Sequence, residues 1–164
     1  MRSKTNSSGI KLYPIMNTLI LQHMNITFIS SALSTLKWVW QLPQHLIAVI
    51  TIIVIDKLLC LDIKRQKDYN GKRVYETLAI KAGMSLGNYI FLTRKNTTTL
   101  KHEYGHSKQS EYLGLLYLPI IGIPSLLHNV IYRLFRKMNI KWNYYSFYPV
   151  AWANKIVGIK LSTI

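Results

Sequence analysis

Three long blocks without charged residues alternate with short polar and basic segments along the chain. The first block runs from Leu12 to Leu36, but its Asn, Gln, His, Ser and Thr residues dilute its hydrophobicity. We expect an interfacial or weakly spanning helix there. A secretory signal peptide is the alternative, although no clear small-x-small cleavage site follows the apolar part. Together with the basic start Met1 to Lys11, this block predicts an N-terminal region, 1–35, ahead of a main domain, 36–164.

The second block, Trp38 to Ile55, is the strongest candidate for a membrane-spanning helix. Its eighteen residues, WVWQLPQHLIAVITIIVI, end in an almost purely aliphatic run. A helix needs about 20 such residues to cross the hydrocarbon core of a bilayer. We expect Trp38 and Trp40 at the level of the lipid headgroups and a kink at Pro43. The alternative is a buried helix of a soluble domain.

The third block runs from Tyr112 to Tyr132 and is long enough to cross a membrane. Because it contains Pro119, Gly122 and Pro124, we predict a broken or re-entrant path rather than one straight helix. An aromatic stretch ends the chain, and we expect a short helix from Pro149 onward. Four basic residues lie between these segments: Arg133, Arg136, Lys137 and Lys141.

Two short strands are expected between the second and third blocks. They cover Arg73 to Ile80 and Ser85 to Thr93, separated by Ala82-Gly83. A polar turn then leads into a helix that a Thr can cap. We therefore predict an α+β, mainly helical, membrane-associated protein with a short β-hairpin ahead of that helix.

Composition and charge support a membrane partner. Hydrophobic residues make up 49% of the chain and charged residues only 16%, against about 25% in ordinary soluble domains. Lys and Arg number 21 against 6 acidic residues, which gives a net charge of +15. The basic residues are spread between apolar blocks, so we favour lipid over nucleic acid as the partner. A bias in codon usage is an alternative cause of the Lys content. Cys60 is the single cysteine, which excludes an intrachain disulfide.

The expected helix carries the motif His102-Glu103-Tyr104-Gly105-His106. Two His residues four positions apart lie on one helical face, where both can bind a single Zn²⁺. Glu103 beside them can act as the general base for the water that the metal activates. Gly105 would let a neighbouring element pack closely. The competing interpretation is a solvated helix face with two ordinary polar imidazoles.

The motif supplies two protein ligands, whereas a catalytic zinc usually has three. No acidic residue follows Glu111, so a downstream carboxylate ligand is excluded. His128 is a possible extra ligand, although a satisfied or interfacial His is the alternative. Glu111 is five residues after His106, and we expect it away from the ligand face, exposed or at the membrane border. Asn154 offers only a neutral amide oxygen, which is a poor zinc ligand.

Several segments resemble a family of small, largely uncharacterised bacterial membrane proteins. The resemblance lies in SLGNYIFL, TLKHEYGHSKQS and LGLLYLPIIGIPSLL between Gly83 and Ser125, in WQLPQHLIAVI upstream and in FYPVAWANKIVG downstream. It covers roughly residues 36–160. The final motif of that family commonly reads F-Y-T-E-x-W-A-N, which is similar to the E-x-x-A-[DN] element of gluzincin peptidases. The resemblance therefore implies a zincin-like core.

In gluzincins the Glu of that element is the third zinc ligand. Alignment on Trp152-Ala153-Asn154 places Val150 where this Glu would be. The resemblance implies that His102 and His106 are ligands, that Glu103 is the base, and that Asn154 orients a ligand His. It also implies a weakly held metal, because the carboxylate is missing.

The function expected from the sequence is that of a membrane-associated, zinc-dependent peptidase. The alternative is a catalytically inactive relative that binds a partner or peptide, and a third possibility is a basic membrane-surface protein whose motif is accidental. We expect membrane lipid and a peptide or protein substrate as partners, and no nucleic acid. The resemblance places the protein in the bacterial inner membrane. The segment from Asp56 to Lys108 holds 11 of the 21 basic residues, which favours a cytoplasmic motif region.

Overall fold

The computed structural model describes residues 12–80, 83–94, 96–141 and 143–159, with side chains from residue 21 onward. The predicted basic start, Met1 to Lys11, lies outside these residues. The chain divides into two units, Met1–Lys37 and Trp38–Ile164. Most of α1 (Leu12–Trp40) belongs to the smaller unit, and its side chains from Leu21 to Lys37 are exposed.

The block Trp38 to Ile55 does not form one kinked helix, so that prediction was wrong. Helix α1 ends at Trp40, and α2 (Leu42–Ile53) begins after Gln41. Pro43 lies in the first turn of α2, where its missing N–H removes no hydrogen bond and its fixed φ suits a helix start. A π-helical turn, Val54–Leu58, follows α2.

A four-stranded sheet forms the centre of the larger unit, which confirms the α+β class. The strands are β1 (Ile63–Arg65), β2 (Arg73–Thr77), β3 (Met84–Leu86) and β4 (Tyr89–Leu92), in the order β1-β2-β4-β3. A short hairpin does precede the motif helix as predicted, but Ser85 to Thr93 is not one strand. It contains the antiparallel β3–β4 hairpin, which turns at Gly87 with φ +60°. Strand β2 pairs with β4 in parallel.

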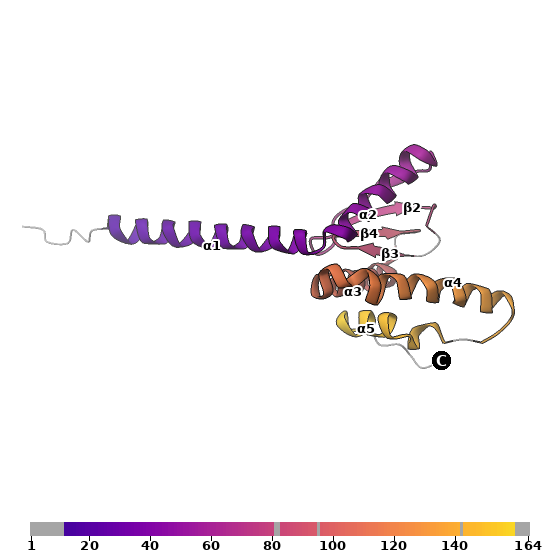
Figure 1. Ribbon diagram of the computed structural model, residues 1–164. Coiled ribbons are helices and arrows are strands. Elements are labelled where there is room, and N and C mark those ends of the chain that lie inside the picture. The colour runs from indigo at the N-terminus through magenta and orange to yellow at the C-terminus, as the bar shows by residue number, and fades with distance from the viewer. Residues whose placement is uncertain (1–11, 81–82, 95, 142, 160–164) are drawn as a thin grey trace, which may run out of the picture. The chain divides into compact units, whose positions relative to one another are not determined.

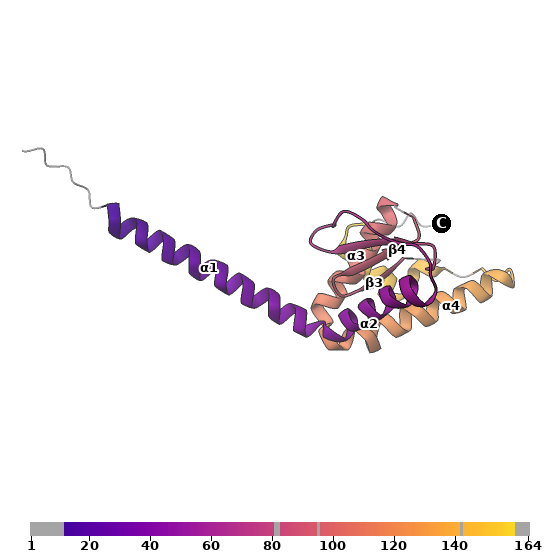
Figure 2. The same ribbon diagram turned by 90° about the horizontal axis from the view of Figure 1, so that it is seen from above.

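Strand β4 is buried on both of its faces. Tyr89 and Phe91 pack with Ala48 of α2, whereas Ile90 packs with Val74 on the opposite side. Helix α3 (Thr97–Leu113) covers that opposite side through Leu100 and Tyr104. Figures 1 and 2 show α2 and α3 on opposite faces of the sheet. This arrangement leaves β3 at an edge of the sheet, next to α3.

The helix that carries the motif, α3, is capped by Asn96 rather than by a Thr. The Asn96 side chain accepts hydrogen bonds from the backbone N–H groups of Thr98 and Thr99. Helix α5 (Tyr148–Ile156) packs closely on α3, and a Cβ atom at Gly105 would lie 2.4 Å from the carbonyl oxygen of Ala153. The prediction that Gly105 permits close packing is therefore confirmed.

The third uncharged block is helical for most of its length. After a 3-10 turn, Gly114–Leu116, a π-helical segment (Leu118–Gly122) continues directly into α4 (Ile123–Lys137). The predicted broken path was wrong, because Leu118–Lys137 is one continuous helix. Pro119 lies in its first turn, where no hydrogen bond is lost. Pro124 lies farther along, and the carbonyl of Ile120, which loses its intrahelical donor there, accepts a hydrogen bond from the Tyr148 hydroxyl. In the described part of the chain, Leu118–Lys137 is the one helix that is by itself long and apolar enough to cross a membrane. The segments Leu21–Trp40 and Leu42–Leu58 pass that test only together.

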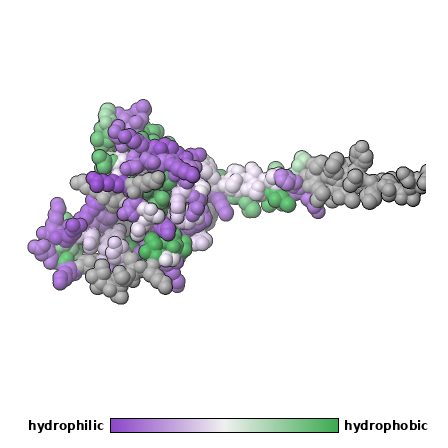
Figure 3. All heavy atoms as spheres, turned by 180° about the vertical axis from the view of Figure 1, so that it is seen from behind, coloured by the Kyte–Doolittle hydropathy of each residue, from purple (hydrophilic) through white to green (hydrophobic). Residues whose placement is uncertain are grey.

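The surface of the larger unit is not uniformly polar. The face seen in Figure 3 mixes hydrophilic and hydrophobic side chains. Exposed apolar side chains occur on both α2 and α4: Leu46, Ile47, Val49, Ile50 and Ile53 on α2, and Ile123, Leu126, Leu127, Val130, Ile131 and Leu134 on α4. A 3-10 turn, Tyr144–Ser146, then leads into α5, whose position agrees with the short helix predicted from Pro149.

Candidate functional site

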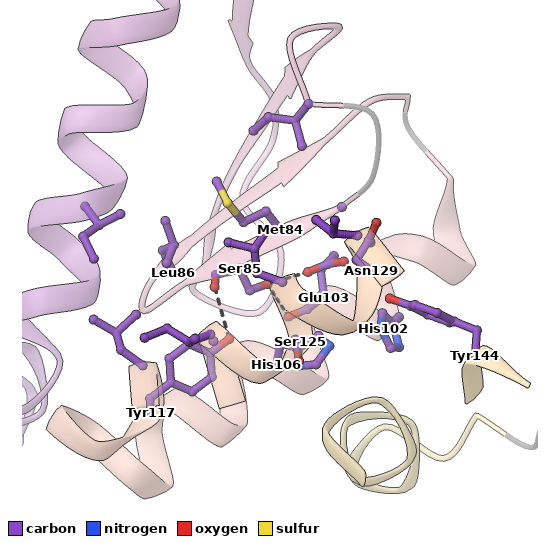
Figure 4. Close-up of a pocket in the computed structure, with 18 of the residues that line it drawn as sticks. Met84, Ser85, Leu86, His102, Glu103, His106, Tyr117, Ser125, Asn129 and Tyr144 are labelled. Carbon is purple, nitrogen blue, oxygen red and sulfur yellow. Dashed lines mark hydrogen bonds between the residues drawn. The ribbon is translucent and has the colours of Figure 1, made fainter. Parts of the chain in front are cut away.

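A cavity of about 550 Å³ lies between the edge strand β3, the motif helix α3 and helix α4. Its volume falls within the range of small-molecule and peptide sites, about 300–1,000 Å³. Three residues of the motif line it: His102, Glu103 and His106. Figure 4 shows these side chains grouped below β3, with Ser85, Tyr117 and Tyr144 around them. The three chemically important positions of the motif thus share one cavity.

Both imidazoles of the motif are held by amide oxygens at Nδ1. The Nδ1 atom of His102 lies 2.7 Å from Oδ1 of Asn154, and that of His106 lies 2.7 Å from Oε1 of Gln109. Nε2 of Gln109 in turn donates to the carbonyl oxygen of Pro149, which fixes the orientation of the amide. Because an amide oxygen only accepts, each Nδ1 carries the proton and each Nε2 keeps its lone pair. This is the tautomer that binds a metal through Nε2.

Burial keeps both imidazoles neutral at physiological pH. Burial, together with the neighbouring His102, lowers the pKa of His106 to about 3. It also lowers the pKa of His102, although the hydrogen bond with Asn154 acts in the opposite direction. Metal ligands must be deprotonated before they bind. The two rings, whose centroids are 4.8 Å apart, therefore meet that requirement.

Glu103 is buried at the strand edge, with 5% of its surface exposed. Its Oε2 atom lies 3.0 Å from the hydroxyl of Ser85, which also donates to the Glu103 backbone carbonyl at 2.6 Å. Burial raises the pKa of Glu103 to about 8, although the Ser85 hydroxyl partly opposes this. Gly83 provides the space for the carboxyl group, because a Cβ there would lie 2.2 Å from Oε1. Without a nearby cation, Glu103 holds a proton at neutral pH.

The wall of the cavity opposite the motif carries polar side chains among apolar ones, and these were not predicted from the sequence. Ser125, Asn129 and Arg133 of α4 line it, together with Tyr144. In Figure 4 the Tyr144 ring extends toward His102, and Asn129 lies close by. Both side chains line the cavity. Burial and the nearby Glu103 raise the pKa of Tyr144, so its hydroxyl is a hydrogen-bond donor at neutral pH.

Helix α5 places the remaining predicted residues against α3. Asn154 contacts His102, as the resemblance implied for a residue that orients a ligand His. Val150, one helical turn earlier, is buried with 1% of its surface exposed. Nδ2 of Asn154 is buried and has no hydrogen-bond partner among the described residues. The face of α5 that meets α3 therefore carries an unused donor and, at Val150, no carboxylate.

The structure does not bring His128 into the site. Its ring stacks on Phe147, with centroids 4.2 Å apart, and contacts Tyr144, whereas His128 itself does not line the cavity. Among the described residues, no group of three or more His, Cys, Asp or Glu side chains could hold a metal. His128 thus lies apart from the two His residues of the motif in this structure.

Glu111 is turned away from the His pair, as expected, but it is neither fully exposed nor alone. Its carboxylate accepts from Nζ of Lys72 at 2.6 Å and from Nζ of Lys108 at 2.8 Å. Lys72 is itself buried, with 3% of its surface exposed. Glu111 thus forms an ion pair that joins α3 to the turn preceding β2.

One of the missed residues had a signal in the sequence. Gln109 follows His106 by three positions, so it lies on the same face of α3 and within reach of the imidazole. Ser85, Asn129 and Tyr144 had no such signal, because they meet the motif only through the packing of separate elements.

Comparisons of the chain with protein-family models, with curated proteins and with solved structures gave no match. The family resemblance in the sequence thus stays a prediction, and the chemistry of the site has to be argued from its own residues.

Proposed function

We propose that this protein is a membrane-associated, zinc-dependent peptidase whose metal is held by His102 and His106. The observation that carries the proposal is the orientation of the two imidazoles. Asn154 and Gln109 fix both rings in the tautomer that leaves Nε2 available, and burial keeps both rings neutral. An accidental pair of surface histidines has no need of two amide partners. The residues present therefore fit a metal that takes imidazole nitrogen, as zinc does.

Glu103 is positioned to act as the general base. It lies in the same cavity as the two His residues, and Ser85 and Gly83 hold its carboxyl group in place. Zn²⁺ at the His pair would supply Lewis acidity, lowering the pKa of a water molecule and polarising a peptide carbonyl. A cation nearby also lowers the pKa of a carboxyl group. Glu103 would then be ionised at neutral pH, able to accept a proton and pass it to the leaving amine.

Membrane association is supported by the apolar helices. Leu118–Lys137 is long and apolar enough to span a bilayer, and α2 exposes an apolar face. The positive net charge of +15 would favour an anionic lipid surface. In the proposed arrangement, the cavity lies next to these helices, because Ile47 of α2 and Leu126 of α4 both line it.

The second candidate is a catalytically inactive protein that keeps the same cavity for binding a peptide. Val150 favours it, because this buried apolar residue stands where the alignment expects a carboxylate ligand. Two imidazoles alone hold a metal less tightly than a complete set of three ligands.

Metal analysis and peptide hydrolysis distinguish the two candidates. We expect the purified parent protein to contain zinc and His102→Ala to contain none. His23→Ala is the control and should keep zinc, because His23 is an exposed residue of α1. Glu103→Gln should keep the metal and lose hydrolysis. Parent protein without any zinc, after purification in zinc-containing buffer, would refute the metal site.

Val150→Glu tests the missing ligand directly. Position 150 is one helical turn before Asn154 on the face that meets α3, so the new carboxylate could accept from the unused Nδ2 of Asn154. A gain in zinc affinity and in hydrolysis would identify a peptidase weakened by the loss of its third ligand. Unchanged metal binding and activity would favour the peptide-binding candidate.

A further inference from the structure

Helix α4 presents a stripe of polar residues to the cavity. Ser125, Asn129 and Arg133 are spaced four residues apart, which places them along one side of the helix, and all three line the cavity. The hydroxyl oxygen of Ser125 is buried and has no hydrogen-bond partner among the described residues. A buried hydroxyl normally has a partner. The stripe thus has unused hydrogen-bonding capacity directed at the cavity.

Tyr144 lies in the cavity together with this polar stripe and the motif. Its side chain lines the same cavity as Asn129 and Glu103, and in Figure 4 its ring extends toward His102. Asn129 therefore lies opposite the proposed reacting groups. Arg133 is one helical turn farther along α4, about 6 Å away at 1.5 Å per residue. An extended peptide advances about 3.3 Å per residue, so this distance corresponds to about two residues of substrate.

Arg133 has no carboxylate partner among the described residues, although all six acidic residues of the chain are described. No carboxylate of residues 12–80, 83–94, 96–141 or 143–159 lies within 4.0 Å of its guanidinium. Four acidic residues form ion pairs with other cations: Asp56 with Lys57, Asp62 with Lys64, Asp68 with Arg65, and Glu111 with Lys72 and Lys108. Glu76 is hydrogen-bonded to Gln66, and Glu103 to Ser85. Arg133 is thus an exposed, permanent cation on the wall of the cavity, without a carboxylate partner in the part of the chain that the structure describes.

We propose that Arg133 binds a carboxylate of the substrate, one to two residues from the bond whose hydrolysis Glu103 assists as general base, while Asn129 and Tyr144 contact the intervening peptide backbone. This inference rests on the proposed peptidase or peptide-binding function and names its substrate class. A guanidinium suits this role because its planar donors match a carboxylate in a bidentate pair. The carboxylate can be the C-terminus of a peptide or an acidic side chain, since the two share the same chemistry.

Matched peptides test the proposal through binding and hydrolysis. Four versions of one apolar peptide carry either a free C-terminus or a C-terminal amide, combined with either Glu or Gln two residues before the end. Binding is measured by fluorescence anisotropy on Glu103→Gln protein, and hydrolysis on the parent. We expect the removal of every carboxylate to weaken binding by roughly 10- to 100-fold, as expected for the loss of a charge-assisted hydrogen-bonded pair.

Arg133→Gln should abolish this preference for carboxylate and leave the binding of the neutral peptide unchanged. Arg136→Gln is the matched control, because Arg136 is an exposed residue of the same helix that does not line the cavity. The free-terminus and Glu versions show which carboxylate is the source. Loss of binding to phosphatidylglycerol vesicles in Arg133→Gln, with peptide preference retained, would overturn the proposal in favour of a lipid contact.

The remaining outcomes separate this inference from the proposed function. Hydrolysis of all four peptides at one rate, unaffected by Arg133→Gln, would refute the carboxylate site and leave the peptidase standing. Binding that requires both a carboxylate and Arg133, without any hydrolysis by the parent, would support the carboxylate site and count against the peptidase.

Discussion

The substitution Gly105→Ala tests how closely α3 and α5 must approach. A Cβ atom at this position would lie 2.4 Å from the carbonyl oxygen of Ala153, whereas real Cβ contacts are essentially never shorter than 3.0 Å. Backbone cannot rotate away as a side chain can, so the two helices must separate by at least about 0.6 Å, the difference between these distances. Such overpacking typically lowers the free energy of unfolding by about 1–3 kcal/mol, and the better helix propensity of Ala offsets up to about 1 kcal/mol of this loss.

The same shift should reach the His pair. Asn154 follows Ala153 directly, so its 2.7 Å contact with Nδ1 of His102 would lengthen to about 3.3 Å, beyond the usual range of about 2.7–3.2 Å for such a bond. We therefore expect a lower free energy of unfolding together with weaker zinc binding. With about 2–4 °C per kcal/mol for a chain of this size, the melting temperature should fall by several degrees.

Thermal unfolding followed by circular dichroism, and zinc titration of the same samples, provide the measurements. Gly122→Ala is the matched control, because its Cβ would meet mainly the flexible end of the Leu118 side chain, at 3.3 Å. We expect this control to stay within about 1 kcal/mol of the parent. An unchanged or higher melting temperature in Gly105→Ala, with normal zinc affinity, would refute the close contact of α3 and α5.

Three further predictions concern other groups. The pKa of Glu103 is raised to about 8, so the metal-free native state keeps a proton that the unfolded chain releases above its ordinary pKa of 4.5. The free energy of unfolding should therefore fall as the pH rises from 4.5 to 8, by up to about 1.4 kcal/mol per pH unit. Urea titrations should show that Glu103→Gln removes this decline. Burial raises the pKa of Glu111, but hydrogen bonds from Lys108 and Lys72 outweigh it and lower the pKa overall. Glu111→Gln would leave the buried Lys72 without its anion, and the free energy of unfolding in urea at pH 7 should fall by about 2–4 kcal/mol. A fall below about 1 kcal/mol would contradict the role of this ion pair. Asn96→Ala removes the cap of α3 and should cost about 1 kcal/mol, measured as a lower melting temperature, whereas Asn96→Ser should restore the parent value.

Local patterns in the sequence were sufficient to predict the elements that carry the motif. The four-residue spacing of His102 and His106 predicted one helical face, and Gly105 predicted a close neighbour because only a missing Cβ permits such an approach. The short helix after Pro149 followed from the position of that residue. These inferences depend on residues within one or two helical turns of each other, where geometry is fixed by the backbone.

The pairing of the strands could not be predicted in the same way. Strand β2 pairs with β4 rather than with its neighbour β3, and this parallel pairing depends on how α2 and α3 cover the sheet. The apolar runs alone do not distinguish a single strand from the β3–β4 hairpin, because β4 is buried on both faces and lacks an alternating pattern.

One wall of the cavity likewise could not be predicted from the sequence. The polar stripe of α4 was hidden in a block that was interpreted as membrane-spanning, and Arg133 was counted with the basic residues that follow such a block. Only the placement of α4 and Tyr144 opposite α3 reveals that these residues share a cavity with Glu103. Hydropathy cannot carry this information, since it averages over the faces of a helix.

The dependence of the His pair on α5 also sets the order in which the site can be assembled during synthesis. The contact between His102 and Asn154 joins residues 52 positions apart, and that between Gln109 and Pro149 joins residues 40 positions apart. A nascent chain that has left the ribosome only as far as α4 already contains both imidazoles, Glu103 and Gln109, but not Asn154, which holds His102, nor Pro149, which orients Gln109. The two imidazoles would therefore reach their final orientation only after α5 has emerged and closed on Gly105.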